Sequence, residues 1–169
     1  MPLTTRIALH VAAVVVTLQP ALLCAVEATT AEERAEAVRS ARELEQNPFG
    51  EQPREQRGLL LRWWREIPDL RLRWCESLML DLKIGDDEFT GTIHVQALLS
   101  GGAFLIENPE AADEPRTVWI AGIAGALRTY RRAVELNPDV KSEDLDELVE
   151  LERAGRLGEY VDRHAPTCD

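Results

Sequence analysis

Between about Thr90 and Ile106 the chain carries no Asp, Glu, Lys or Arg, and most of its residues there are apolar. The stretch is too long for one β-strand, since strands in globular proteins usually have about 3 to 10 residues. We therefore expect a largely buried helix. Ser100, Gly101 and Gly102 lie in its middle and oppose this interpretation, because each glycine costs a helix about 1 kcal/mol relative to alanine.

Two helices are predicted before this stretch. Thr30 followed by Glu33 is typical of a capping box, and it begins a charged helix that runs to about Gln46. The second helix begins near Pro53 and has the clearest amphipathic pattern in the chain. Its apolar face consists of Leu60, Trp63, Trp64 and Ile67.

Three helices are predicted after it. The longest runs from Pro115 to about Leu136, Ser142 begins the next with acids in its first turn, and a short one follows Gly155. The long helix carries a patch of small residues that lets another backbone come close. We expect this patch, Ala121, Gly122, Ala124, Gly125 and Ala126, to pack against Ala97, Gly101 and Gly102.

Residues 70–84 fit two secondary structures. Leu70, Leu72 and Trp74 alternate with arginines as in a strand, whereas Trp74, Leu78 and Leu82 have helical spacing. Length favours the helix. We therefore expect an all-α fold over residues 29–169, a single compact domain of five to six helices, and the alternative is an α+β fold with a small hairpin around residues 70–84.

Residues 1–28 have the layout of a secretory signal peptide. Arg6 precedes an apolar run over residues 7–18, and Val26-Glu27-Ala28 provides the small residues that signal peptidase requires. We expect cleavage after Ala28, a mature chain that begins at Thr29, and a periplasmic or extracellular location.

Two other interpretations of this segment remain. Cys24 could carry a lipid, but Leu23 stands where a small residue should precede the modified cysteine. The segment could also be an uncleaved anchor, but Gln19 and Pro20 interrupt an apolar run that would need about 20 residues to span a bilayer. We expect no integral span in the mature chain.

Cleavage leaves two cysteines, Cys75 and Cys168. Two such thiols tend to pair in an oxidising compartment, so we predict a disulfide that attaches the C-terminal tail to the core. The alternative is a buried Cys75 thiol and a Cys168 that frays with the last residues. Zinc binding by these cysteines with His94 and His164 lacks the spacing of a metal site, and we expect no metal and no cofactor.

The charge distribution argues against one class of partner. The chain has 30 acidic and 19 basic residues, whereas nucleic-acid binding requires a basic surface. Residues 53–75, however, contain six arginines and three of the four tryptophans. Trp63 and Trp64, flanked by Arg62 and Arg65, are the predicted binding residues, because arginine beside tryptophan can bind anions and planar groups. The alternative is a core helix whose tryptophans pack inward under arginine stems.

A polar stripe on the central apolar helix is the best candidate for chemistry. Gln96, Ser100 and Glu107 lie at positions i, i+4 and i+11. In a cleft, desolvation would favour the protonated form of Glu107 and let it act as a general acid or base, with His94 as a titratable partner. The simpler hypothesis is that the stripe is the solvent-facing side of this helix.

The sequence contains no phosphate-binding loop, HExxH, paired CxxC or nucleophile elbow. It therefore favours a binding or structural protein that engages an unidentified protein or cell-envelope component through helical faces. One alternative is a hydrolase that uses Glu107 with His94 or Gln96. Another is association with a membrane surface by the Arg/Trp helix.

Overall fold

A computed structural model of the chain describes residues 28–80, 82, 84–166 and 168. Residues 1–27, which include nearly all of the predicted signal peptide, lie outside the described residues. Those described form seven α-helices and two short 3₁₀ helices, and none of them lies in a strand. The predicted all-α fold is therefore confirmed, and the alternative hairpin around residues 70–84 is wrong. The helices are α1 (Ala31–Gln46), α2 (Glu51–Glu66), α3 (Ser77–Leu80), α4 (Asp87–Glu107), η1 (Pro109–Asp113), α5 (Pro115–Leu136), η2 (Pro138–Val140), α6 (Glu143–Arg153) and α7 (Leu157–His164).

Two predicted helix starts are visible in detail. Thr30 caps α1 through the expected capping box, in which Thr30 Oγ1 accepts from Glu33 N at 3.1 Å and Thr30 N donates to Glu33 Oε2 at 2.7 Å. Ser142 caps α6, with its side chain accepting from Leu145 N at 3.3 Å. Local side-chain chemistry therefore sets where these helices begin.

The helix expected between Trp74 and Leu82 is much shorter, since α3 is the only helix among the described residues of that segment. Contacts with α5 hold the preceding residues in an irregular path. Trp119 Nε1 donates to the Arg73 carbonyl at 2.7 Å, and the Trp74 ring lies against Gly122. Tertiary contacts thus override a local helical pattern, which is a weak preference by itself.

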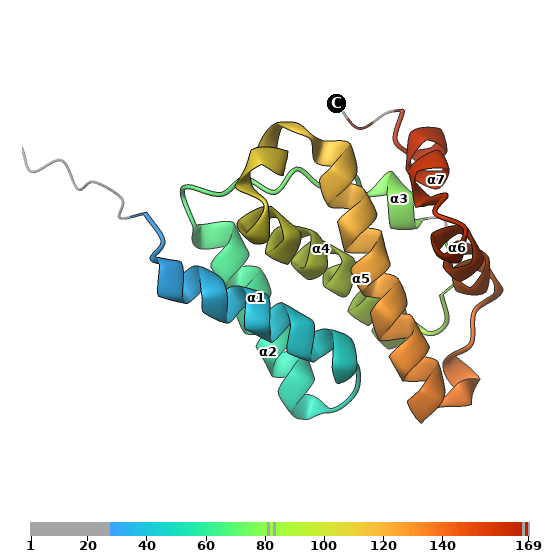
Figure 1. The fold of residues 1–169 in the computed structure, drawn as a ribbon. Helices are drawn as coiled ribbons and strands as arrows, with labels where there is room; N and C mark the ends of the chain where they lie inside the picture. The colour runs from blue at the N-terminus through green and yellow to red at the C-terminus, as the bar shows by residue number, and fades with distance from the viewer. Residues whose placement is uncertain (1–27, 81, 83, 167, 169) are drawn as a thin grey trace, which may run out of the picture.

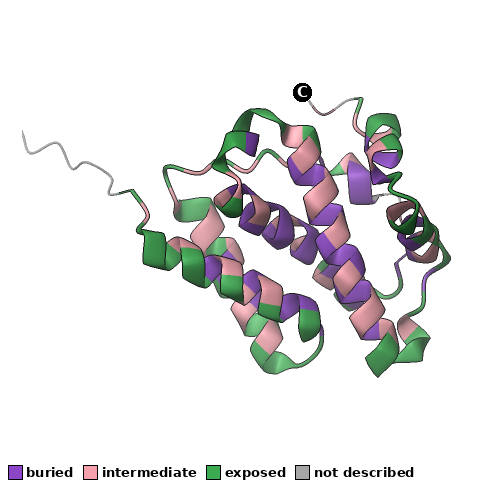
Figure 2. Ribbon diagram, in the orientation of Figure 1, coloured by how far each residue is buried: buried purple, intermediate pink, exposed green. Residues whose placement is uncertain are grey.

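Helices α4 and α5 lie side by side in the middle of the fold (Figure 1). Helices α1 and α2 cover one side of the pair, and α3, α6 and α7 cover the other. Helix α4 contributes Leu99 and Ala103 to the apolar cluster with α1 and α2, and Ile93 and Ala97 to the cluster on the opposite side. Figure 2 shows α4 as mostly buried, which explains why its sequence carries no charge over almost its whole length.

Helix α4 also has the length and composition of a membrane span, over residues 88–107 with a mean hydropathy of 1.3. In this fold, 56% of that segment is buried inside the protein. The core helix of a water-soluble protein meets the same criteria, so the apolar composition of α4 is accounted for by its place between the two clusters.

Small residues bring α4 and α5 together as predicted. A Cβ atom added to Gly122 would lie 2.6 Å from the Ala97 carbonyl oxygen, and one added to Gly101 would lie 3.3 Å from that of Val118. Gly102 departs from the prediction. Its neighbour is the Trp64 ring of α2, at 2.3 Å from such a Cβ atom. Gly102 therefore makes room for α2, on the other side of α4.

The predicted disulfide is present. Cys75 and Cys168 are joined with their Cα atoms 5.4 Å apart, across 93 residues of sequence. In the chain-entropy model, closing a loop of this length stabilises a fold by about 4 to 5 kcal/mol. The bond fits an oxidising environment, in which disulfides persist.

We predict opposite effects for two glycine-to-alanine substitutions. Gly125→Ala should lower the free energy of unfolding by about 1 to 3 kcal/mol, because the new Cβ atom would lie 2.1 Å from the Ser100 side chain. Gly58→Ala, in α2, meets nothing within 4 Å and should raise it by up to about 1 kcal/mol through helix propensity. Urea unfolding of both variants measures this, and equal stability of the two would contradict the packing described here.

Candidate functional site

The predicted polar stripe of α4 is mostly buried. Gln96 and Ser100 have exposed fractions of 0%, so the hypothesis that the stripe faces solvent is wrong for these two residues. Gln96 Nε2 donates to Ser100 Oγ at 3.1 Å and to the Ala41 carbonyl of α1 at 3.0 Å. The stripe therefore faces α1, and its polar atoms bond mainly within the protein.

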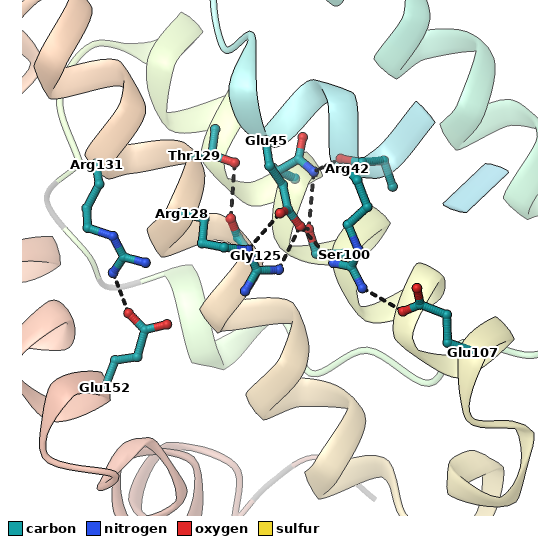
Figure 3. A network of polar contacts seen from close by, with 11 residues as sticks. Arg42, Glu45, Ser100, Glu107, Gly125, Arg128, Thr129, Arg131 and Glu152 are labelled. Carbon is teal, nitrogen blue, oxygen red and sulfur yellow. Dashed lines mark hydrogen bonds and ion pairs between the residues drawn. The ribbon is translucent and has the colours of Figure 1, made fainter. Parts of the chain in front are cut away.

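A buried carboxylate that the sequence analysis did not identify lies at the end of this stripe. Glu45 of α1 is 2% exposed. Its Oε1 accepts from Ser100 Oγ at 2.8 Å and from Arg42 Nη1 at 2.9 Å. Arg128 of α5 forms a two-pronged contact with it, with Nε 2.7 Å from Oε2 and Nη2 2.8 Å from Oε1 (Figure 3).

The electrostatics of this cluster follow from its donors. Burial by itself favours the protonated form of Glu45, but the hydrogen bonds and charge of Arg128, together with the hydrogen bonds of Ser100 and Arg42, outweigh it. The pKa of Glu45 therefore lies below its ordinary value of 4.5. A carboxylate that is ionised and holds four donors is a poor proton donor and a weak base. We assign it to holding α1, α4 and α5 together.

The residues of the predicted acid/base pair are not brought together. Glu107 is exposed and its Oε2 accepts from Arg42 Nη2 at 2.7 Å, at the outer end of the same network (Figure 3). His94 Nε2 lies 3.0 Å from the Met79 carbonyl oxygen. The two residues are 13 positions apart on one helix, which at about 1.5 Å per residue separates them by roughly 20 Å. A hydrolytic site made of Glu107 with His94 has no geometric support, and Gln96, about 16 Å from Glu107 by the same measure, does not supply one.

The predicted binding residues of α2 divide into two kinds. Arg62 and Arg65 are exposed. Trp63 and Trp64 meet edge to face with ring centroids 5.4 Å apart. The two rings have different surroundings. Trp64 covers Gly102 of α4, and its indole Nε1 is buried without a hydrogen-bond partner among the described residues. Trp63 lies at the outer surface, where it lines a groove.

This groove, which we call the α1–α2 groove, has a volume of about 690 Å³. Leu60 and Ala37 are its buried apolar residues. Leu59 is 63% exposed, more than any other large apolar side chain in the described part of the protein, and it lies one helical turn before Trp63. The groove is lined by Thr30, Glu32, Glu33, Glu36, Ala37, Arg39, Ser40, Gln56, Leu59, Leu60 and Trp63.

Two of the residues that matter most here were missed, although each left a signal in the sequence. Glu45 lies four residues after Ala41, so helical spacing places it on the buried face of α1. Leu59 precedes the predicted apolar face of α2 and extends that face toward its edge. Neither position identifies its partner, because those contacts join residues far apart in the chain.

Metal binding finds no support in the described residues. The sulfur atoms of Cys75 and Cys168 are used in their disulfide. No group of three or more His, Cys, Asp or Glu side chains in the described part of the chain is arranged to hold an ion.

Comparison with protein-family models, with curated protein sequences and with solved structures finds no match for this chain.

We predict that Glu45→Gln lowers the free energy of unfolding at neutral pH by about 2 to 3 kcal/mol. This is less than the roughly 3 to 5 kcal/mol for breaking a fully buried pair, because Arg42 and Arg128 are each about one third exposed and can turn to water. Because folding lowers the pKa of Glu45, its contribution is complete above about pH 4.5 and is lost as the pH falls through the folded value.

Urea unfolding between pH 3 and 7 tests this, and the difference between wild type and variant should shrink below about pH 4.5. Glu150→Gln is the matched control, because Glu150 forms an exposed pair with Arg153 on α6 and should contribute less than about 1 kcal/mol. A Glu45→Gln variant as stable as this control would show that the cluster does not hold the three helices.

Proposed function

We propose that this protein is exported, with cleavage after Ala28, and acts as a binding protein that takes an apolar segment with basic flanks into the α1–α2 groove. The observation that carries the proposal is Leu59, an exposed leucine beside Trp63 in a groove with an apolar floor. Large apolar side chains that gather in a hollow with a polar rim are typical of protein-binding sites.

The apolar part of the groove sets the first requirement on a partner. Leu59 and Trp63 lie on one face of α2, and Ala37 of α1 lies across from them. A volume of about 690 Å³ is within the range of roughly 300 to 1,000 Å³ found for binding pockets. An amphipathic helix that presents leucine-like side chains along one stripe fits such a groove.

The rim of the groove sets the second requirement. Glu32, Glu33 and Glu36 are exposed along α1, against one basic residue, Arg39. The protein as a whole has a formal net charge of −11. A partner segment with lysine or arginine beside its apolar stripe would meet complementary charge and approach faster at low salt.

Two observations support export. The Cys75–Cys168 disulfide suits an oxidising compartment. Thr29, the first residue of the proposed mature chain, donates from its backbone nitrogen to Asp69 Oδ2 at 3.2 Å and from its hydroxyl to Oδ1 at 3.1 Å. Cleavage after Ala28 would turn that nitrogen into a cationic terminus facing the same carboxylate, which is a favourable pair.

We predict that the protein binds a synthetic amphipathic helix of leucine and lysine, and that Leu59→Ser weakens this binding about tenfold or more. The substitution removes the exposed anchor and should leave the fold intact, because Leu59 is mostly exposed. Isothermal titration calorimetry with the disulfide-bonded protein measures the affinities. The charge of the rim predicts that salt weakens the binding.

Leu136→Ser is the matched control, because Leu136 is 52% exposed but lies on α5 outside the groove. A peptide with glutamate in place of lysine is the control for charge. Three outcomes would overturn the proposal: no binding of the lysine peptide, equal binding of the glutamate peptide, or equal losses in the two leucine variants. Adsorption to anionic vesicles that Leu59→Ser leaves unchanged, without binding of the peptide, would favour the membrane alternative instead.

A further inference from the structure

Arg57 of α2 is a buried cation without a counter-charge. It is 6% exposed, and no carboxylate among the described residues forms an ion pair with it. Its Nη2 donates to the carbonyl oxygens of Leu44 and Asn47, each at the long distance of 3.4 Å, and its Nε has no hydrogen-bond partner in the part of the chain that the structure describes. Burial lowers the pKa of Arg57 to about 10, so the guanidinium remains charged at neutral pH.

The protein compensates this charge only in part. The two carbonyls belong to the C-terminal end of α1, where aligned peptide dipoles carry about half a negative charge. Burying a full positive charge is costly unless it is paired and hydrogen-bonded. Arg57 is the only buried arginine in the described part of the chain. An anion from outside the protein could supply the missing negative charge.

Arg57 lines a hollow of about 720 Å³ between α2, the start of α4 and the loop after α1. The other lining residues are both polar and apolar. The rings of Phe49 and Phe89 lie with centroids 6.0 Å apart, and Leu61 and Val95 are also part of the lining. Phe49 is 39% exposed, one of few large apolar side chains in the described residues that face solvent.

Charges at the mouth of the hollow restrict which anion it could accept. Asp86 and Glu88 line it together with Arg54, whose Nη1 is 3.6 Å from Glu88 Oε1. Asp86 is engaged in capping α4, where it accepts from Phe89 N at 2.8 Å. Two acids that line the same hollow as Arg57 disfavour a doubly charged phosphate more than a ligand with a single negative charge.

We propose that this hollow binds a monocarboxylate on an apolar body, with the carboxylate on Arg57 and the body against the rings of Phe49 and Phe89. The planar guanidinium fork matches a carboxylate, which it can hold through two parallel hydrogen bonds. A hollow of this volume encloses a small organic acid. The acid could be free or could be the C-terminus of a peptide that ends in an apolar residue. This site is separate from the α1–α2 groove.

The test uses the full disulfide-bonded protein with two acids and their neutral amides as probes. The acids are 3-phenylpropanoate, which represents a free acid, and N-acetyl-Ala-Phe, which represents a peptide terminus. Calorimetric titration should give saturable binding of at least one acid and at least tenfold weaker binding of its amide. Arg57→Met should weaken binding of the acid at least tenfold. The matched control, Arg54→Met, changes an exposed arginine of the same helix and should alter it no more than about twofold.

Thermal unfolding separates binding from a purely structural role of Arg57. Because the substitution removes a buried charge that the protein compensates only in part, Arg57→Met should unfold at the same temperature as wild type or higher. A second variant covers the case in which Arg57→Met does not fold. Gly91→Leu keeps the guanidinium and places its new Cβ atom where nothing lies within 4 Å. Because Gly91 lines the hollow, the leucine side chain should obstruct it and weaken binding of the acid.

The inference is overturned if neither acid binds saturably, if acid and amide bind equally, or if Arg57→Met binds as wild type does. A large loss of stability in Arg57→Met, with acid binding in Gly91→Leu unchanged, would show that Arg57 serves only to cap α1. None of these outcomes bears on peptide binding to Leu59, so the two proposals fail separately.

Discussion

The carboxylate of Glu45 is the contact on which the arrangement of the helices depends most. Glu45 belongs to α1, and its carboxylate joins this helix to Ser100 of α4 and Arg128 of α5 at a place where α1 has only a thin apolar stripe. A buried ion pair contributes less to stability than its distances suggest, because desolvation opposes it. Here the ion pair mainly orients α1. Because the two oxygens of one carboxylate accept hydrogen bonds from both α4 and α5, they fix the rotation of α1 about its axis and its position along the other two helices.

The position of α1 determines the shape of both candidate binding surfaces. The α1–α2 groove exists because α1 and α2 pack side by side, and the Arg57 hollow is closed by the loop that leaves α1. The same requirement explains Gly125, since any side chain there would occupy the space in which Ser100 meets Glu45. One packing arrangement therefore includes Gly125, the Glu45 carboxylate, the α1–α2 groove and the Arg57 hollow.

The sequence was sufficient for the features that depend on neighbours in the chain. Caps at Thr30 and Ser142 and the long buried helix were predicted because neighbouring residues determine each of them. The contact between α4 and α5 was predicted because each helix carries small residues that let the other backbone come close. The Cys75–Cys168 disulfide was also predicted, because two cysteines leave a single pairing.

Most other contacts between distant segments could not be predicted. Ser100 and Glu45 are 55 residues apart, so the polar stripe of α4 was expected to face water when it faces a carboxylate. In the same way, Arg57 was one of six arginines in a basic stretch, and nothing in its local pattern distinguishes the buried one from the five others. Exposure of Leu59 depends on how closely α1 approaches, which no spacing within α2 determines.

The disulfide has a consequence for the order in which the molecule matures. Cys168 lies 93 residues after Cys75, so a ribosome must synthesise all of α4 to α7 before the second sulfur is available. The disulfide can therefore form only after the residues of α4, α5, α6 and α7 have been synthesised. A truncated product that stops short of residue 168 would lack this bond and the resistance to unfolding that it provides, even if all seven helices were present.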